Sequence, residues 1–192
     1  MSINISEKSN FIWRIADILR GDYKQSEYGD VILPFTVLAR LDSVLEDTKD
    51  EVLHLNQTLK YKNKDPFLTR AAGYKFYNTS EFTFGKLKDD ANNIVDNLTD
   101  YIKGFSENAR TILESFDIYS QIERLEKANL LYLVVSKFAD DINLHPDNVS
   151  NNEMGCIFEE LIRKFSEMWI GNSFLDKITP NKKLLLLQFL SC

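Results

Sequence analysis

The residues that could do chemistry in this sequence are concentrated in one basic and aromatic stretch, Lys60 to Lys88. It holds seven cations but only two acids, Asp65 and Glu81, and so carries +5 in a chain whose net charge is −6. Lysine and arginine neutralise phosphate groups, and interleaved aromatic rings stack on bases or brace the loop that presents the cations. We therefore predict that part of the stretch contacts the phosphates of a nucleic acid, without base-specific readout. The seven predicted contact residues are Lys60, Lys62, Lys64, Arg70, Lys75, Lys86 and Lys88.

A solvated loop is the alternative interpretation of the same stretch. Lys60, Lys62 and Lys64 alternate, so on a helix their side chains would spread over more than about 200° instead of forming one face. Aromatic side chains also belong more often to a core than to a platform for bases. Turn-forming residues, among them Asn78-Thr79-Ser80, make the stretch rich in loops, and they predict a short hairpin around Phe76 to Phe84.

Other residue types that could do chemistry stand alone in this chain. His54 and His145 have no partner motif, and Cys156 and Cys192 are 36 residues apart. This spacing fits neither a zinc site nor a disulfide framework, and it suits a reducing cytosol. Cys156 lies in an apolar run and is expected to be a small buried thiol. We predict no catalytic residue and no metal site.

The composition is typical of a water-soluble globular protein. At 192 residues, with 44% hydrophobic and 27% charged residues, the chain is long enough for one domain with a sizeable core. The first residues, MSINISEKSN, are polar and do not resemble a signal peptide. No apolar run, including Leu184 to Leu187, is long enough to span a bilayer. A cytoplasmic protein with no membrane partner is expected.

The element that must position the basic stretch is Ser26 to Glu46. From Val31 onward its apolar residues cover an arc of about 200° at helical spacing, so we expect a helix with partners on more than one side. Arg40 falls in the polar remainder of the circle. Pro34 removes a backbone donor, which predicts a helix start or a kink within Gly29 to Pro34.

Asp42 is the exception in that apolar arc. A lone buried carboxylate costs several kcal/mol, so Asp42 is predicted to be a structural residue with a cationic or hydrogen-bonding partner. The candidate partners are Arg14 and Arg20 of a preceding helix.

Helical periodicity continues through most of the remaining chain. The second helix is expected to extend toward Leu59, and the helices resume at about Lys86 with a run that ends at Gly104. Asn151 or Asn152 is expected to cap the last clear helix. The predicted fold is all-α, an irregular multi-helix bundle with a basic, aromatic loop region.

Four long stretches follow one another along the chain: FIWRIADILRGDYKQSEYGDVILPFTVLARLD, YKFYNTSEFTF, NLTDYIKGFSENAR and NEMGCIFEELIRKFSE. Together they resemble the N-terminal helical domain of the modification (M) subunit of type I restriction–modification enzymes. The resemblance covers about Ile5 to Glu167 and divides the chain into a domain, 1–167, and a divergent tail, 168–192.

This resemblance implies a role for the chain in a larger assembly. The complete family subunit methylates the N6 amino group of adenine in duplex DNA with S-adenosylmethionine. It acts with a second M subunit and a specificity subunit, and with a translocating nuclease subunit for restriction. The helical domain is implied to help close around duplex DNA and to pack against these subunits.

The sequence departs from the family pattern after Glu167. The family continues with Gly-Glu-Phe-Tyr-Thr-Pro-Arg or a near variant and a Rossmann-like catalytic domain, whereas here the text is MWIGNSFLDKITPNKKLLLLQFLSC. The cofactor loop needs closely spaced glycines, but the glycines here are never closer than eight residues apart. The catalytic Asn-Pro-Pro-Phe motif needs adjacent prolines, and all four prolines are isolated. We therefore expect no cofactor site and no methylation by this chain alone.

A truncation or frameshift after Glu167 is our hypothesis, and reading the downstream DNA in all frames tests it.

Two functions from different classes remain open at this point. The first is a DNA-clamping and subunit-docking domain of a type I adenine methyltransferase. The second is a helical protein–protein interaction module without a DNA role, in which the basic stretch is only a soluble loop. DNA binding that weakens steeply with salt would favour the first.

Overall fold

The computed structural model describes residues 14–167, and within them the chain is helical and forms no strand. The predicted all-α fold is thus confirmed. The predicted tail, 168–192, lies outside the described residues. Residues 14–19 are helical. The later helices are α2 (Tyr28–Leu45), α3 (Lys49–Thr58), α4 (Asp65–Ala72), α5 (Phe84–Lys88), α6 (Ile94–Lys103), α7 (Glu107–Ser115), α8 (Ile118–Lys127), α9 (Leu131–Asp141) and α10 (Asn151–Glu167).

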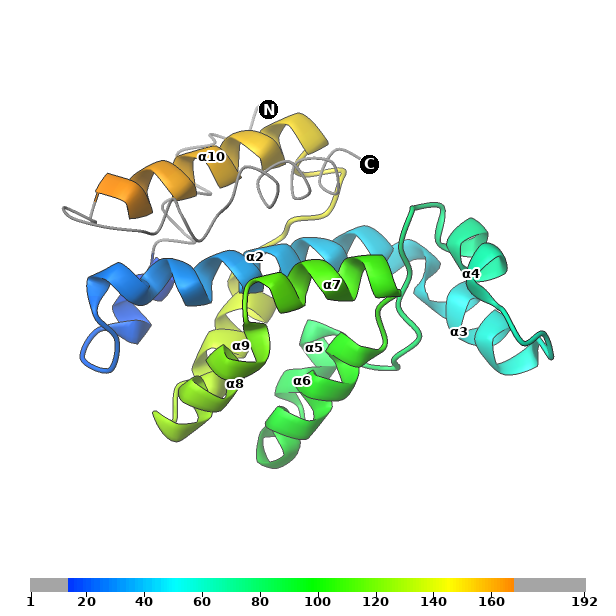
Figure 1. The fold of residues 1–192 in the computed structure, drawn as a ribbon, viewed down its shortest axis with the longest axis horizontal. Coiled ribbons are helices and arrows are strands. Elements are labelled where there is room, and N and C mark those ends of the chain that lie inside the picture. Colours follow the sequence, from blue (N-terminus) through cyan, green and yellow to red (C-terminus); the bar gives the residue numbers. More distant parts are fainter. Residues whose placement is uncertain (1–13, 168–192) are drawn as a thin grey trace.

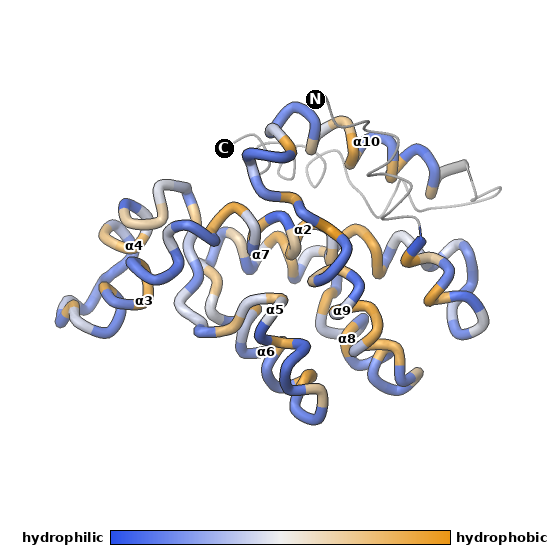
Figure 2. The backbone as a smooth tube through the Cα atoms, turned by 180° about the vertical axis from the view of Figure 1, so that it is seen from behind, coloured by the Kyte–Doolittle hydropathy of each residue, from blue (hydrophilic) through white to orange (hydrophobic). Residues whose placement is uncertain are grey.

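Helix α2 runs through the middle of the molecule. Helix α10 lies along one side of it, and α7, α8 and α9 pack on the other (Figure 1). Hydrophobic residues follow α2 and the helices α8 and α9 beside it (Figure 2). The wide apolar arc predicted this arrangement correctly, because a helix with partners on several sides needs apolar residues around most of its circumference.

Two details of α2 differ from the prediction. The helix begins at Tyr28, one residue before the expected range, and continues through Pro34. Arg40, placed on the polar side by the sequence, is only 1% exposed. Its guanidinium donates hydrogen bonds to the carbonyl oxygens of Leu144 and Val149, the latter at 2.9 Å, and to Oδ1 of Asn151 at 2.7 Å. The polar side of α2 is therefore covered by the segment that leads into α10.

A chain of aromatic rings connects α2 to α5, at the end of the basic stretch, and to α6. Phe35 of α2 stacks on Phe138 of α9 with ring centroids 5.9 Å apart, and Phe138 contacts Phe84 at 6.2 Å. Phe84 meets Tyr101 edge-on at 6.4 Å, and Tyr101 meets Phe105 at 5.2 Å. Since all five rings are buried, they fix α5 and α6 against the core.

The predicted hairpin around Phe76 to Phe84 is wrong. This segment pairs instead with the chain that follows α6, in an isolated antiparallel bridge between Asn78 and Phe105. The Thr79 N–H donates to the Gly104 carbonyl at 2.9 Å, and the Ser106 N–H donates to the Tyr77 carbonyl at 3.0 Å. Turn-forming residues indicated extended chain here, but they could not indicate its partner.

The helix expected from Lys86 to Gly104 is interrupted between α5 and α6. The backbone of Asp90 is not helical, with φ −127° and ψ 73°, and its carboxylate accepts hydrogen bonds from the side-chain amides of Asn93 and Asn97. The second helix likewise stops at Leu45, and α3 follows after a 3₁₀ turn at Glu46–Thr48.

Two predictions near α10 are also wrong. Ser150 caps this helix, through hydrogen bonds exchanged with Glu153, in place of Asn151 or Asn152. Cys156 is exposed, not buried, whereas its neighbours Met154 and Ile157 supply the buried side of α10.

Candidate nucleic-acid interface

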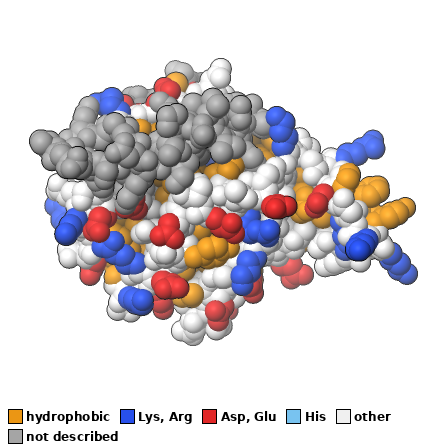
Figure 3. Space-filling view, in the orientation of Figure 1, with side chains coloured by type: hydrophobic (Ala, Val, Ile, Leu, Met, Phe, Trp, Pro, Cys, Tyr) orange, Lys and Arg blue, Asp and Glu red, His pale blue; other side chains and the backbone are white. Residues whose placement is uncertain are grey.

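The basic stretch begins in a helical hairpin, α3 and α4, that extends from one end of the molecule (Figure 1). The two helices pack on each other, and the Thr48 hydroxyl donates to the Ala72 carbonyl at 3.3 Å across the base of the hairpin. The connecting loop spans residues 59–64. Lysine, arginine and hydrophobic side chains gather at this end of the surface (Figure 3).

The seven predicted cations differ in how their charges are engaged. Lys64 and Lys86 donate to the backbone carbonyls of Asn56 and Glu81, and Lys88 pairs with Asp140. The hydrogen bond that the Lys88 ammonium donates to the Asp140 carboxylate raises the pKa of Lys88. Within residues 14–167, the remaining four are exposed and have no ion pair: Lys60, Lys62, Arg70 and Lys75.

A groove of about 660 Å³ lies between the hairpin loop and the turn that joins α6 to α7. Lys62 and Lys64 line one wall, and Lys103 and Arg110 line the other. Lys103 is exposed, with Asp100 3.8 Å away, and the Arg110 guanidinium donates to the Lys103 carbonyl at 3.3 Å. Asp65 and Glu107 also line the groove, so its four cations outnumber its acids.

The floor of the groove is held rigidly between its walls. The Tyr77 hydroxyl donates to the Asp65 carboxylate at the start of α4. Burial, with the Asp65 carboxylate beside it, raises the pKa of Tyr77 to about 12, so the hydroxyl keeps its proton at neutral pH. Gly104 allows the two segments of the floor to approach, because a Cβ there would lie 2.7 Å from the Ser80 nitrogen and from Asn78 Oδ1.

Lys103 and Arg110 were missed by the sequence argument. Both lie outside the stretch with the strong basic balance, and both have acids nearby in sequence, Asp100 and Glu114. The local charge pattern therefore marks them as ordinary helix-surface pairs. Only the pairing of residues 77–79 with residues 104–106 brings them opposite the hairpin loop.

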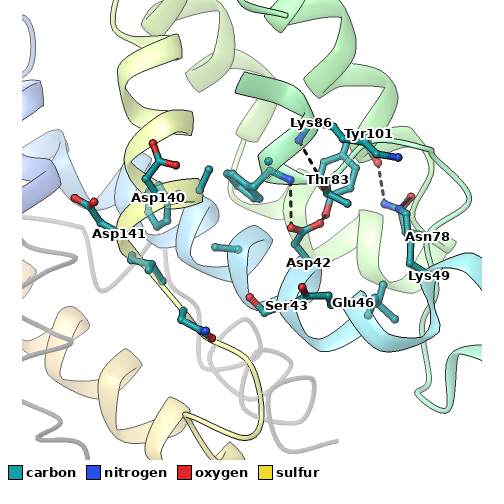
Figure 4. Close-up of a pocket in the computed structure, with 18 of the residues that line it drawn as sticks. Asp42, Ser43, Glu46, Lys49, Asn78, Thr83, Lys86, Tyr101, Asp140 and Asp141 are labelled. Atoms are coloured by element: carbon teal, nitrogen blue, oxygen red, sulfur yellow. Dashed lines mark hydrogen bonds between the residues drawn. The ribbon is translucent and has the colours of Figure 1, made fainter. Parts of the chain in front are cut away.

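A second cavity, of about 590 Å³, lies between the base of the hairpin and helices α5 and α9. Asp42 points from α2 toward Tyr101 of α6 at this cavity (Figure 4). The Tyr101 hydroxyl donates to Asp42 Oδ1 at 2.6 Å, and the Phe84 N–H donates to Oδ2 at 3.2 Å. Asp42 thus joins α2 to both α5 and α6.

Lys49, the first residue of α3, lies beside this carboxylate. Its ammonium donates to Asn78 Oδ1 at 3.3 Å and lies 5.5 Å from the centre of the Tyr101 ring. Burial lowers the pKa of Lys49 to about 8, although the negative charge of Asp42 opposes the change. Burial also raises the pKa of Asp42. The base of the hairpin is therefore fixed to the core by partly desolvated charges.

The predicted arginine partners of Asp42 are wrong. Arg20 is exposed and pairs with Asp17 at 2.7 Å, and Arg14 is exposed on the first helix. The groups that stabilise the Asp42 carboxylate are the Tyr101 hydroxyl, the Phe84 amide and the charge of Lys49, and they act against burial and the charge of Glu46. Amphipathic spacing placed Asp42 correctly on a covered face but could not identify the element that covers it.

The described residues offer two further findings on what the domain can bind. Between residues 14 and 167, no group of histidine, cysteine, aspartate and glutamate side chains is arranged to hold a metal ion. No helix in the same range is long and apolar enough to cross a membrane.

The comparisons with known proteins give one match. The model of the family described as HsdM N-terminal domain matches residues 8–138, which is more than half of the chain. No curated protein and no solved structure matches the chain. The matched range includes the central helix, the hairpin and both walls of the basic groove. The chain therefore belongs to the HsdM N-terminal domain family, the N-terminal domain of the modification subunit of type I restriction–modification systems.

Proposed function

We propose that this domain provides the DNA-clamping and subunit-docking part of a type I modification enzyme that methylates adenine in duplex DNA. The basic groove between the hairpin and the α6–α7 turn is the DNA contact. Methyl transfer, with S-adenosylmethionine, belongs to the catalytic domain of the complete subunit. In the cytoplasm the domain acts beside a second M subunit and the specificity subunit, which selects the target sequence.

One observation carries the DNA assignment, namely that cations from two separate elements face the same groove. Lys62 and Lys64 come from the hairpin loop, and Lys103 and Arg110 come from the other wall. An extended phosphate backbone needs positive charge along its path, and it releases counterions when that charge is supplied. Because the groove floor is braced, the two walls that carry these cations are held in place before DNA arrives.

The test is fluorescence anisotropy on a short labelled duplex at several salt concentrations. The double variant Lys62→Glu/Lys103→Glu changes one exposed cation on each wall. Each lost phosphate contact reduces the slope of log K against log salt by about 1, so the double variant should reduce it by about 2. The matched control Arg20→Glu/Lys127→Glu reverses two exposed cations elsewhere and should bind like the wild type. An equal loss of DNA affinity in both double variants would show that net charge alone determines binding. An unchanged affinity in both would refute the groove as the DNA contact.

A protein-interaction module without a DNA role remains the second candidate, and one surface favours it. Tyr132 and Leu133 of α9 are 42% and 50% exposed, and neighbouring large apolar side chains on a surface are typical of protein contacts. Co-purification with the specificity subunit and a full-length M subunit tests this surface. Capture that Tyr132→Ser/Leu133→Ser abolishes, from a domain that shows no salt-dependent DNA binding, would favour the second candidate.

A further inference from the structure

The tip of the α3–α4 hairpin exposes two stacked aromatic rings. Tyr61 and Phe67 are 62% and 42% exposed, yet their rings lie nearly parallel, at 16°, with centroids 5.1 Å apart. The other large hydrophobic side chains with comparable exposure in residues 14–167 are Tyr132 and Leu133, on a different helix. Exposed rings that stack on each other leave their outer faces open to a further flat partner.

Hydrogen bonds fix the end of the hairpin loop and the first turn of α4, next to the aromatic pair. The Lys64 ammonium donates to the carbonyl of Asn56 at the end of α3, and the Asp65 N–H donates to Asn63 Oδ1 at 3.1 Å. Pro66 lies in the first turn of α4, where its ring suits the helix, and the Phe67 N–H donates to the Lys64 carbonyl at 3.0 Å. The Phe67 ring, on which Tyr61 stacks, is therefore positioned before a partner binds, and this lowers the entropy cost of binding.

Positive charge surrounds the aromatic pair. Lys60 and Lys62 flank Tyr61 in the loop, and Arg70 lies one helical turn after Phe67, where it shares the same face of α4. Between residues 14 and 167, none of these three cations has an ion pair. The nearby acid, Asp65, is engaged by the Tyr77 hydroxyl. A nucleobase can stack on an open ring face, and the phosphates of the same strand are attracted to the unpaired cations around it.

We infer that the tip of the hairpin binds an unpaired base of a DNA strand, with Tyr61 as the stacking surface. Bases inside an intact duplex are covered on both faces by their neighbours, so only a base outside the helical stack can meet the ring face-on. This inference rests on the proposed DNA contact of the adjacent groove. It adds a preference for DNA that carries an extrahelical base, a preference that the groove cations alone do not supply.

The experiment compares a short intact duplex with the same duplex carrying one extrahelical thymine. Base–aromatic stacking corresponds to roughly 5- to 150-fold in affinity, so the wild-type chain should bind the second duplex more tightly by a factor in this range. Tyr61→Ala/Phe67→Ala should remove this preference and leave affinity for the intact duplex and the salt slope unchanged. Tyr61→Phe keeps the ring and should keep the preference. Tyr132→Ala, which removes an exposed ring from α9, is the matched control and should behave like the wild type.

A spectroscopic readout separates stacking from a general loss of affinity. With 2-aminopurine in place of the extrahelical thymine, the wild-type chain should quench its fluorescence at saturation, and the double alanine variant should not. Equal weakening toward both duplexes, or an unchanged preference in the alanine variant, would overturn the inference while leaving the groove contact intact. Failure of both duplexes to bind the wild-type chain would overturn the groove contact as well. An alanine variant that keeps the preference for the extrahelical base but no longer co-purifies with the specificity subunit would assign the tip to a protein partner instead.

Discussion

Replacement of Arg40 by methionine should destabilise the domain more than any substitution at an exposed basic residue. The Arg40 side chain is 1% exposed, and its guanidinium supplies donors to two backbone carbonyls and to Asn151. Methionine fills a similar volume, so the change leaves little cavity and mainly removes the donors.

The size of the effect follows from the acceptors that are left behind. Leu144 and Val149, whose carbonyls lose their donor, are each 1% exposed, and a buried acceptor without a partner costs about 1–3 kcal/mol. Asn151 is half-buried and can turn to water, so it contributes less. Removal of the buried guanidinium relieves part of its desolvation cost. We expect a net loss of about 3–4 kcal/mol in the free energy of unfolding.

Urea denaturation followed by far-ultraviolet circular dichroism measures this loss. Arg20→Met is the matched control, because Arg20 forms only an exposed pair with Asp17 and should change stability by less than about 0.5 kcal/mol. Arg40→Lys keeps the charge but not the two-nitrogen fork of the guanidinium, so its loss in the free energy of unfolding should lie between those of Arg40→Met and Arg20→Met. An Arg40→Met variant within about 1 kcal/mol of wild type would show that water replaces the donors, and it would refute the reasoning.

Four shorter predictions concern the base of the hairpin and the chemistry of the chain. Tyr101→Phe removes a donor to the Asp42 carboxylate and should cost about 1–3 kcal/mol in urea denaturation, with no change in DNA affinity. Because the folded pKa of Lys49 is about 8, below its unfolded value, wild-type stability should rise between pH 8 and 10, and Lys49→Met should abolish that rise. Gly104→Ala places a Cβ 2.7 Å from the Ser80 nitrogen and should lower the free energy of unfolding by about 1–3 kcal/mol. Gly73 has open space around it, so the control Gly73→Ala should change stability only through the positive φ of that residue. With labelled S-adenosylmethionine, the chain alone should transfer no label to duplex DNA, and label recovered in the DNA would contradict this.

The features that follow from local periodicity were predictable from sequence. The apolar arc of Ser26 to Glu46 indicated a helix covered on several sides, and α2 has that arrangement. The family, too, could be inferred, because its stretches are long and occur in order. These signals are encoded in neighbouring residues, so a single sequence contains them.

The partners of those features were not predictable. Arg40 was assigned to the polar side because periodicity cannot show that residues 144–151 cover it. Asp42 was assigned an arginine, whereas its partner is a tyrosine 59 residues later. Part of the groove was missed for the same reason, since Lys103 joins it only through a bridge between distant segments. Each error concerns a contact between residues far apart in the chain.

The hydrogen bonds of Arg40 cannot form until late in synthesis on the ribosome. Their acceptors lie 104 to 111 residues after Arg40 in the chain. At roughly 5–20 residues per second, the central helix therefore emerges about 5–20 seconds before the segment that satisfies its buried charge. During that interval the apolar circumference of the helix has no complete cover, so the nascent chain exposes apolar surface until residues 144–151 emerge.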